Sequence, residues 1–285
     1  MKSVVITGVS TGIGEATAKL LAARGFKVYG SVRKSEDGER LKREIGESFE
    51  PLLFDVIDEA AVKAAADKVR ADLNGQTLVG LVNNAGISVP GPSLMVPVEK
   101  WRHQLEVNII GPVIVMQAFA PLLGTDLSQK GEPGKIVNIS SVAGKRAFPF
   151  QGPYAASKHG LEAVSESLRR ELMLYGVDVI IVGPGPIKTA IWAKGAKADF
   201  SAYEGTPYLA PLKKLRDIMQ AGGMKGLPPE DVAGLIHHAL TSAQVWPRYT
   251  IAPGKFKRWL LSKLPLRVFD RIIANQIGLK NVRKD

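Results

Sequence analysis

Residues 1–14 read MKSVVITGVSTGIG, and this stretch decides the fold. A short apolar strand at Lys2 to Ile6 runs directly into a glycine-rich turn. We expect a helix over residues 15–24 that stops at Gly25, before a second strand at residues 26–32. The order strand, turn, helix, strand is typical of a dinucleotide-binding loop rather than of a chance group of glycines.

Glycine has two uses in such a turn. It permits the tight backbone, and it lets N–H groups at the helix N-terminus approach a pyrophosphate, where the helix dipole favours negative charge. A merely permissive turn is the alternative interpretation of the glycines taken alone.

Strands and helices then alternate regularly along the chain. Apolar strands are expected near Val4, Val28, Leu53, Val79, Ile136 and Val179, separated by helical segments. Within the helix expected at residues 58–73, apolar side chains recur on one face. The alternation predicts an α/β fold, a doubly wound (Rossmann) parallel sheet of about seven strands with helices on both faces.

We expect a single domain. Residues 1–189 would form its cofactor and catalytic core, 190–228 a substrate lid, 229–254 the last helix and strand, and 255–285 an amphipathic C-terminal tail.

A tyrosine and a lysine, Tyr154 and Lys158, stand four residues apart and therefore share one helix face. A phenol is a poor acid at neutral pH, and a neighbouring ammonium favours the phenolate and lowers the phenol pKa. The pair is suited to proton transfer, although most such pairs are surface packing with an extended lysine.

With both motifs present, the chain resembles the short-chain dehydrogenase/reductase family over Lys2 to Thr189. The tail resembles, more loosely, members that include 17β-hydroxysteroid and retinol dehydrogenases. The matching features, in order, are TGVSTGIG at 7–14, Asp55, NNAG at 83–86, Asn108, Ser141, the Tyr154/Lys158 pair and PGPIKT at 184–189.

The resemblance implies a catalytic role for four residues. Ser141, thirteen residues before Tyr154, would hydrogen-bond the substrate oxygen, and Tyr154 would exchange a proton with it. Lys158 would hold the nicotinamide ribose and keep the Tyr154 pKa low, and Asn108 would carry a water that links Lys158 to solvent. Hydride would move between the nicotinamide and the substrate carbon.

The same resemblance implies a set of cofactor-binding residues. They are Gly8, Ser10, Thr11, Gly12, Ile13, Gly14, Arg33, Lys34, Asp55, Val56, Asn83, Ala85, Gly86, Tyr154, Lys158, Pro184, Gly185, Ile187 and Thr189.

The cofactor preference depends on the end of the second strand. Members that prefer NAD usually carry an acidic side chain there, and here Arg33 and Lys34 offer cations suited to a 2′-phosphate. Thr11 departs from the pattern, because many NADP-preferring members have a basic residue at that point. We expect NADP(H) to be preferred, with NAD(H) possible.

Composition narrows the class further. The 285 residues contain no cysteine, which excludes disulfides and thiolate sites, and the four scattered histidines predict no metal site. The net charge of +11 raises a nucleic-acid-binding alternative, but no reader motif accompanies it. A non-catalytic cofactor sensor is a further alternative, but such proteins typically lack the Tyr154/Lys158 pair. An extended-type epimerase or dehydratase usually has a different spacing of the glycines in its cofactor loop.

The N-terminus is already a strand, so we expect no signal peptide and a cytoplasmic protein. The apolar stretch Val107 to Met116 contains Asn108 and should pack in the core. From the resemblance to the family, we expect the protein to form a homodimer or a homotetramer.

We expect the residues that follow Thr189 to determine which substrate binds. Residues 190–227 are rich in aromatic residues and glycines and resemble a mobile lid over an apolar pocket, with Pro149, Phe150 and residues 89–94 as further walls. We expect a lipophilic alcohol or ketone, with a β-ketoacyl thioester reductase as the alternative. The basic, amphipathic tail would close the pocket, pack on a subunit or touch an anionic membrane surface peripherally.

Overall fold

The computed structural model describes residues 2–189, 199–254, 263–279 and 281. Its strands form one parallel sheet of seven, in the order β3-β2-β1-β4-β5-β6-β7. The strands are β1 (Ser3–Ile6), β2 (Lys27–Val32), β3 (Phe49–Leu53), β4 (Gly80–Asn83), β5 (Lys135–Ile139), β6 (Asp178–Pro184) and β7 (Arg248–Ile251). The predicted doubly wound α/β fold is confirmed.

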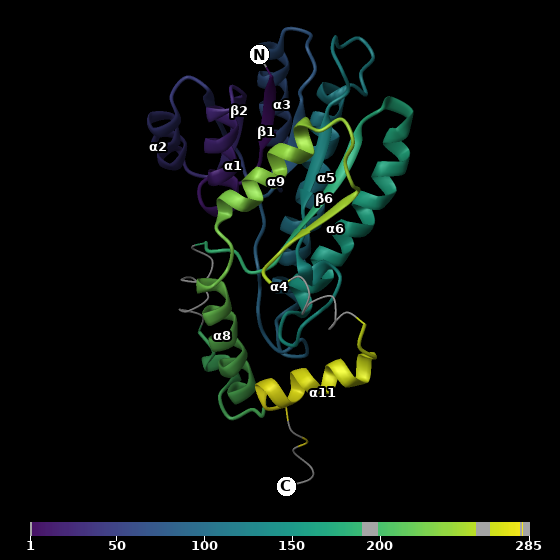
Figure 1. The fold of residues 1–285 in the computed structure, drawn as a ribbon. Helices are drawn as coiled ribbons and strands as arrows, with labels where there is room; N and C mark the ends of the chain where they lie inside the picture. Colours follow the sequence, from purple (N-terminus) through teal and green to yellow (C-terminus); the bar gives the residue numbers. More distant parts are fainter. Residues whose placement is uncertain (1, 190–198, 255–262, 280, 282–285) are drawn as a thin grey trace.

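Helices cover both faces of the sheet (Figure 1). Val4 and Ile6 of β1 pack on one face with α1 (Gly12–Ala23), α2 (Ser35–Ile45) and α9 (Pro229–Thr241). Val5, between them, points to the other face, which is covered by α3 (Glu59–Leu73), α5 (Gly111–Phe119) and α6 (Gly152–Glu171). This alternation is what a strand buried on both sides requires.

Two helices differ slightly from the predicted boundaries. α1 begins at Gly12 rather than at Glu15, so the glycine-rich turn itself supplies the first helical turn. α3 begins at Glu59, because the Asp58 side chain caps it by accepting from the N–H of Ala61.

One continuous helical stretch crosses the face that α3 and α6 also cover. It consists of α4 (Val98–Leu105), the π-helix η1 (Glu106–Ile110), α5 and the 3-10 turn η2 (Ala120–Leu123). By length and composition alone, Val98–Leu123 is able to cross a membrane, and 44% of its most apolar window is buried in the chain. The buried side packs into the sheet core through residues such as Val115 and Phe119.

A smaller lobe lies beyond the carboxyl ends of the strands, at the bottom of Figure 1. We call residues 199–227 and 263–279 the lower lobe. It contains η5 (Ser201–Tyr203), α8 (Leu209–Met224) and α11 (Leu266–Ile277). Part of the predicted lid (190–198) and parts of the predicted tail (255–262, 280 and 282–285) lie outside the described residues.

Candidate active site

The glycine-rich loop joins β1 to α1 at the carboxyl edge of the sheet. Gly8 and Gly12 have φ angles of 69° and 65°, in the left-handed region that favours glycine. At Gly14 a Cβ would lie 2.3 Å from the Gly8 carbonyl oxygen. The loop is therefore a tight cradle at a helix N-terminus, which fits a pyrophosphate.

Two polar side chains tie this cradle to the segment after β4. The Thr7 hydroxyl accepts hydrogen bonds from the backbone N–H groups of Asn84 and Ala85, each at 3.0 Å. The Asn84 side-chain amide donates to the carbonyls of Thr7 and Gly8 at 3.0 and 2.9 Å. The predicted site set did not include Thr7 or Asn84, although both lie within the two matched motifs.

Further predicted cofactor residues surround the loop. Ser10 offers its carbonyl to Arg40, which donates from Nη2 at 2.8 Å, and exposed Thr11 is the N-cap residue of α1. Thr189, after β6, comes within 3.2 Å of where a Gly12 Cβ would lie. The structure therefore brings the segment after β6 against the glycine-rich loop.

Other members of the predicted set lie along the same edge. Ile13 packs against the core of the α1 face, and Pro184 ends β6. The N–H of Gly185 donates to Ile251 of β7 at 2.8 Å, and buried Ile187 pairs with Leu227.

The predicted cations lie at the end of β2. Arg33 and Lys34 are both exposed, and the Arg33 guanidinium lies 3.7 Å from the Asp55 carboxylate after β3. Asp55 and Arg33 thus border the same part of the edge. Val56, the residue after Asp55, is buried against Gly111 at the start of α5.

The segment after β4 continues toward the predicted catalytic residues. Asn83, the last residue of β4, donates from its side chain to Asn138 of β5 at 2.9 Å. Ala85 borders Gly8 closely, with its Cα 2.9 Å from where a Gly8 Cβ would lie. A Cβ on Gly86 would come within 3.2 Å of Asn108 Oδ1 and 3.7 Å of Lys158 Nζ, so Gly86 leaves the room between these two side chains.

Ser141, Tyr154 and Lys158 come together where β5 meets α6. The Ser141 hydroxyl accepts from the N–H of Ala143 at 3.1 Å and is hydrogen-bonded to the Tyr154 side chain. Lys158 Nζ lies 5.8 Å from the centre of the Tyr154 ring and donates to the Ile139 carbonyl at 2.8 Å. The Ser140 hydroxyl instead donates to Glu162 at 2.8 Å.

Burial changes the pKa of both proton-transfer groups. It raises the pKa of Tyr154 above its ordinary value, against the hydrogen bond from Ser141, which lowers it. It also lowers the pKa of Lys158 to about 8. The low Tyr154 pKa expected from Lys158 is therefore not what the structure gives, because loss of solvent around the phenol outweighs the hydrogen bond from Ser141.

Asn108 lies in the π-helix η1 and is fully buried. Its side-chain amide donates to the Ile87 carbonyl and to Ser157 Oγ, both at 3.0 Å, and accepts from the N–H of Ile87 at 2.9 Å. Gln104, one turn earlier, also donates to the Ile87 carbonyl, at 2.9 Å. Asn108 therefore links the segment after β4 to α6, and the water predicted beside it stays a prediction.

Phe150 occupies an uncommon backbone conformation four residues before Tyr154. Its φ is 61°, which is strained for a non-glycine residue. Its ring is buried in an apolar cluster with residues of the lower lobe, including Tyr203, Leu212 and Ile277. The structure therefore packs Phe150 against the lower lobe, and its role as a wall of the substrate site stays a prediction.

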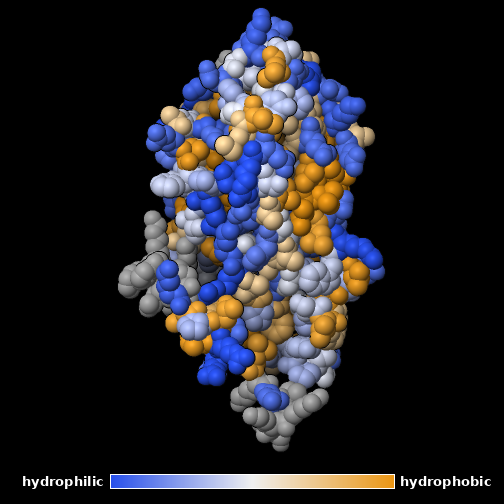
Figure 2. Space-filling model, turned by 90° about the vertical axis from the view of Figure 1, so that its right-hand side faces the viewer, coloured by the Kyte–Doolittle hydropathy of each residue, from blue (hydrophilic) through white to orange (hydrophobic). Residues whose placement is uncertain are grey.

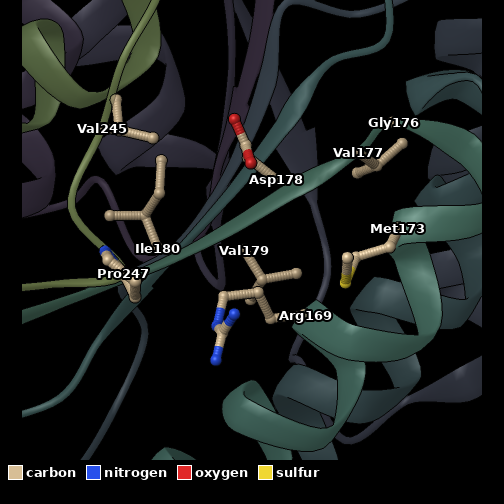
Figure 3. Close-up of a pocket in the computed structure, with 9 residues that line it drawn as sticks. All are labelled: Arg169, Met173, Gly176, Val177, Asp178, Val179, Ile180, Val245 and Pro247. Carbon is tan, nitrogen blue, oxygen red and sulfur yellow. The ribbon is translucent and has the colours of Figure 1, made fainter.

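A surface hollow of about 370 Å³ lies elsewhere (Figure 3). Its lining comes from Arg169 and Met173 near the end of α6, from the amino end of β6 and from Val245 and Pro247 before β7. Because the catalytic candidates lie at the carboxyl ends of the strands, this hollow is not part of their site. Within the described ranges, no three His, Asp or Glu side chains form a metal-ligand group.

Comparison with known proteins identifies the family. The short chain dehydrogenase family model matches residues 2–199. The chain is 40% identical over 278 residues to the NADPH-dependent 3-dehydrocapnine reductase of Ornithobacterium rhinotracheale, covering 97% of this chain and 98% of that protein. It is 32% identical to the 17-beta-hydroxysteroid dehydrogenase type 6 of Bos taurus, covering 96% and 88%.

A solved structure of a short-chain dehydrogenase from Streptomyces avermitilis superposes with a TM-score of 0.77 at 27% identity, covering 98% of each chain. The glycine cradle, the convergence of Ser141, Tyr154 and Lys158 and these similarities agree with one another. The chain therefore belongs to the short-chain dehydrogenase/reductase family of NAD(P)-dependent oxidoreductases.

Proposed function

We propose that the protein is an NADPH-preferring reductase of a lipophilic ketone, with Ser141, Tyr154 and Lys158 as its catalytic residues. The observation that carries this proposal is the convergence of these three side chains beside the glycine cradle. When bound, the nicotinamide supplies hydride to the carbonyl carbon. Ser141 holds the substrate oxygen, and Tyr154 gives it the proton that completes the alcohol.

Lys158 and Asn108 support this chemistry. Lys158 Nζ, 5.8 Å from the Tyr154 ring centre, stabilises charge on the phenol oxygen and holds the cofactor ribose. Asn108 fixes the segment after β4 against α6 through Ser157. Its water link to solvent belongs to the same proposal.

The NADPH preference is supported by charge and by similarity. Arg33 and Lys34 provide two exposed cations at the end of β2, and Arg33 is the fork-shaped donor that suits a phosphate. The 40% identical relative is named as NADPH-dependent. NAD(H) remains the second cofactor in this proposal.

The lipophilic substrate is supported by the lower lobe. Beside Phe150, the lobe provides an apolar cluster of Phe200, Tyr203, Leu212, Leu215 and Ile277. Aromatic and aliphatic walls of this kind favour a large apolar group next to the reacting carbonyl.

The deciding experiment is NADPH oxidation by the purified protein with bulky hydrophobic ketones and with small β-keto thioesters. We expect turnover with the ketones only. Tyr154→Phe should keep NADPH affinity and lose about 100- to 10,000-fold in kcat. Turnover confined to thioesters would favour the β-ketoacyl reductase alternative, and an active Phe variant would overturn the role of Tyr154.

The tail is proposed to cover the substrate side. α11 packs on α8, with the Phe269 ring 4.2 Å below the Arg146 guanidinium and 6.1 Å from the Phe148 ring. Its outer side exposes Leu266, Val268 and Ile272 next to Arg267 and Arg271, a combination that favours contact with anionic lipid. Sedimentation with anionic but not neutral vesicles would support peripheral membrane contact, and no sedimentation would exclude it.

We also propose a homodimer or homotetramer. Figure 2 shows apolar side chains gathered in the upper half of the face seen from the α6 side. Ile110 of η1 is 43% exposed, and Met173 and Leu174 after α6 are exposed as well. Light scattering of the purified protein tests the expectation, and a monomer would contradict it.

A further inference from the structure

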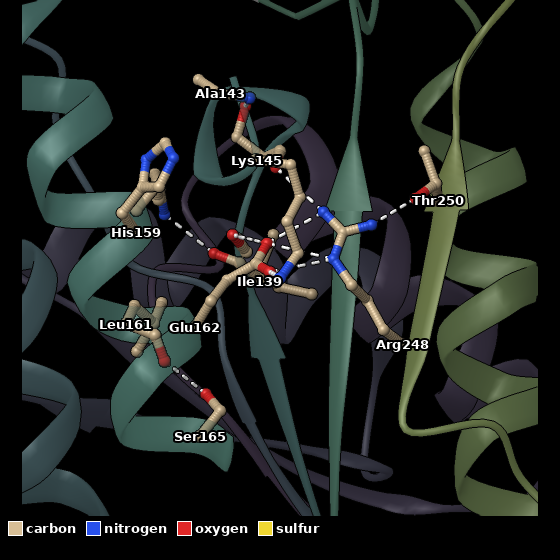
Figure 4. A network of polar contacts seen from close by, with 12 residues as sticks. Ile139, Ala143, Lys145, His159, Leu161, Glu162, Ser165, Arg248 and Thr250 are labelled. Atoms are coloured by element: carbon tan, nitrogen blue, oxygen red, sulfur yellow. Dashed lines mark hydrogen bonds and ion pairs between the residues drawn. The ribbon is translucent and has the colours of Figure 1, made fainter. Parts of the chain in front are cut away.

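An ion pair between a buried carboxylate and a partly buried arginine lies directly behind the proposed catalytic serine. Glu162, on α6, has a side chain only 3% exposed. Arg248, the first residue of β7, reaches across to it with Nε at 3.0 Å from Oε2 and Nη2 at 2.8 Å from Oε1. Figure 4 shows this two-point contact, with Thr250 on the other side of the guanidinium.

The same carboxylate has two more partners, both from the segment that carries Ser141. The Ser140 hydroxyl donates to it at 2.8 Å. Lys145, after the 3-10 turn η3 (Val142–Gly144), places its Nζ 2.8 Å from Oε2. Burial alone would raise the pKa of Glu162, but its bonds to Arg248, Lys145 and Ser140 outweigh burial and hold that pKa below its ordinary value.

Arg248 also contacts the serine segment itself. Its Nη2 donates to the Ser141 carbonyl at 3.3 Å. On the other side, Lys158 donates to the Ile139 carbonyl at 2.8 Å. The backbone on either side of Ser140 is thus held by side chains from α6 and β7, and Glu162 lies one helical turn beyond Lys158.

Two glycines make room for the ion pair. A Cβ on Gly144 would lie 2.5 Å from Ser140 Oγ and 2.7 Å from Glu162 Oε1. A Cβ on Gly183 of β6 would lie 2.6 Å from Arg248 Nη2. A side chain at either position would push against these charged or hydroxyl groups, so β6 and η3 both fit closely around the ion pair.

A buried pair of this kind is weak support for stability, because its attraction offsets the loss of hydration only in part. A planar guanidinium bound at two points does fix geometry well. We propose that Glu162 and Arg248 are positioning residues, which hold the Ser141 backbone so that its hydroxyl meets Tyr154 and the substrate oxygen. This inference rests on the proposed catalytic role of Ser141.

The test is a double-mutant cycle between Arg248→Lys and Ser141→Ala. Arg248→Lys keeps the charge and loses the fork, so we expect kcat to fall up to about 100-fold, as for a misplaced reacting group, while the NADPH Kd stays unchanged. In the Ser141→Ala background the same change should cost almost nothing further, because the group it positions is gone. Equal losses in both backgrounds would overturn the proposal.

Lys145→Met is the matched control. Lys145 binds the same carboxylate but is half exposed and has no hydrogen bond to the Ser141 carbonyl in the described contacts. We expect its kcat to stay within about threefold of wild type. A loss as large as that of Arg248→Lys would mean that charge around Glu162, and not the position of Ser141, is what matters.

A titration without substrate separates this inference from the proposed function. The hydrogen bond from Ser141 lowers the pKa of Tyr154. Loosening Ser141 in Arg248→Lys or Glu162→Gln should therefore raise that pKa, seen in the ultraviolet phenolate signal that Tyr154→Phe removes. A raised Tyr154 pKa in these variants, with no ketone turnover by the wild type, would overturn the proposed reductase function but not the positioning role. An unchanged pKa would overturn the positioning role, whatever the substrate.

Discussion

The cofactor edge of the sheet and the lower lobe are held together by different interactions. At the edge, polar side chains such as Thr7, Asn84 and Asn108 bind backbone groups of neighbouring loops. In the lower lobe, the described contacts are mainly apolar, between Phe150 and residues such as Leu212 and Ile277. Directional bonds fix one geometry, whereas apolar packing tolerates changes of shape, so the edge suits a constant cofactor and the lobe a variable substrate.

The comparison is tested most strongly by removing a buried charge from the edge. Lys158→Met should abolish turnover and yet raise the free energy of unfolding at pH 7 by about 3 kcal/mol, since burial lowers the pKa of Lys158 from 10.5 to about 8. Between those two pH values the unfolded chain binds a proton that the folded chain lacks. Wild-type stability should therefore rise with pH across this window.

Urea unfolding at pH 7 and pH 10 measures both effects. The free energy of unfolding of Lys158→Met should lack the increase with pH that Lys158 causes in the wild type. The difference in stability between the two proteins should therefore be smaller at pH 10 than at pH 7. Parallel pH profiles for the two proteins would contradict the assignment of a buried ammonium.

The next test replaces one apolar side chain in each region. Leu21 on α1 and Leu212 on α8 are both buried, at 0% and 2% exposure. Either Leu→Ala change should lower the free energy of unfolding by about 2–4 kcal/mol if its region unfolds with the rest. We expect the full loss for Leu21→Ala and a smaller global loss for Leu212→Ala, with a raised KM for the ketone and an unchanged NADPH Kd.

Denaturant unfolding followed at several probes, with KM and Kd for each variant, decides the matter. Equal losses of unfolding free energy in the two variants would mean that the lower lobe unfolds together with the sheet. A weakened NADPH affinity in Leu212→Ala would show that the two regions are not separable.

The smallest expected effect concerns the choice of cofactor at the edge. Arg33→Asp should shift the NADPH-to-NADH ratio of kcat/KM by at least about tenfold, near 1.4 kcal/mol, because it removes a phosphate partner and adds a repelling carboxylate. Arg43→Asp, an equal charge change at an exposed position of α2, is the control. An equal shift in both variants would assign the preference to net charge rather than to Arg33.

The edge was largely predictable from the sequence and the lower lobe was not. The glycine-rich turn and the Tyr154/Lys158 pair are local patterns, so spacing alone places their side chains. The Glu162–Arg248 pair joins residues 86 positions apart, for which no spacing rule exists. Its sequence signal was only that Glu162 follows Lys158 by one helical turn, on a buried helix face that also carries Ser157 and Ser165.

The lower lobe shows a second limit. The stretch 190–227 was interpreted as a lid, and the structure contains a 16-residue helix within it, α8. Pro211, Gly222 and Gly223 weaken the helical signal, and Leu212 and Leu215 bury the face that stabilises it. Tertiary packing outweighed local preference there.

The π-helix η1 has a consequence for the length of the chain. Each of its hydrogen bonds spans one residue more than in an α-helix, and one residue corresponds to about 100° of helical rotation. Deleting Val107 would shorten the spacing between Gln104 and Asn108 from four residues to three, so the two side chains would no longer both bind the Ile87 carbonyl. The number of residues between α4 and α5 is therefore as much a determinant of this site as their identity.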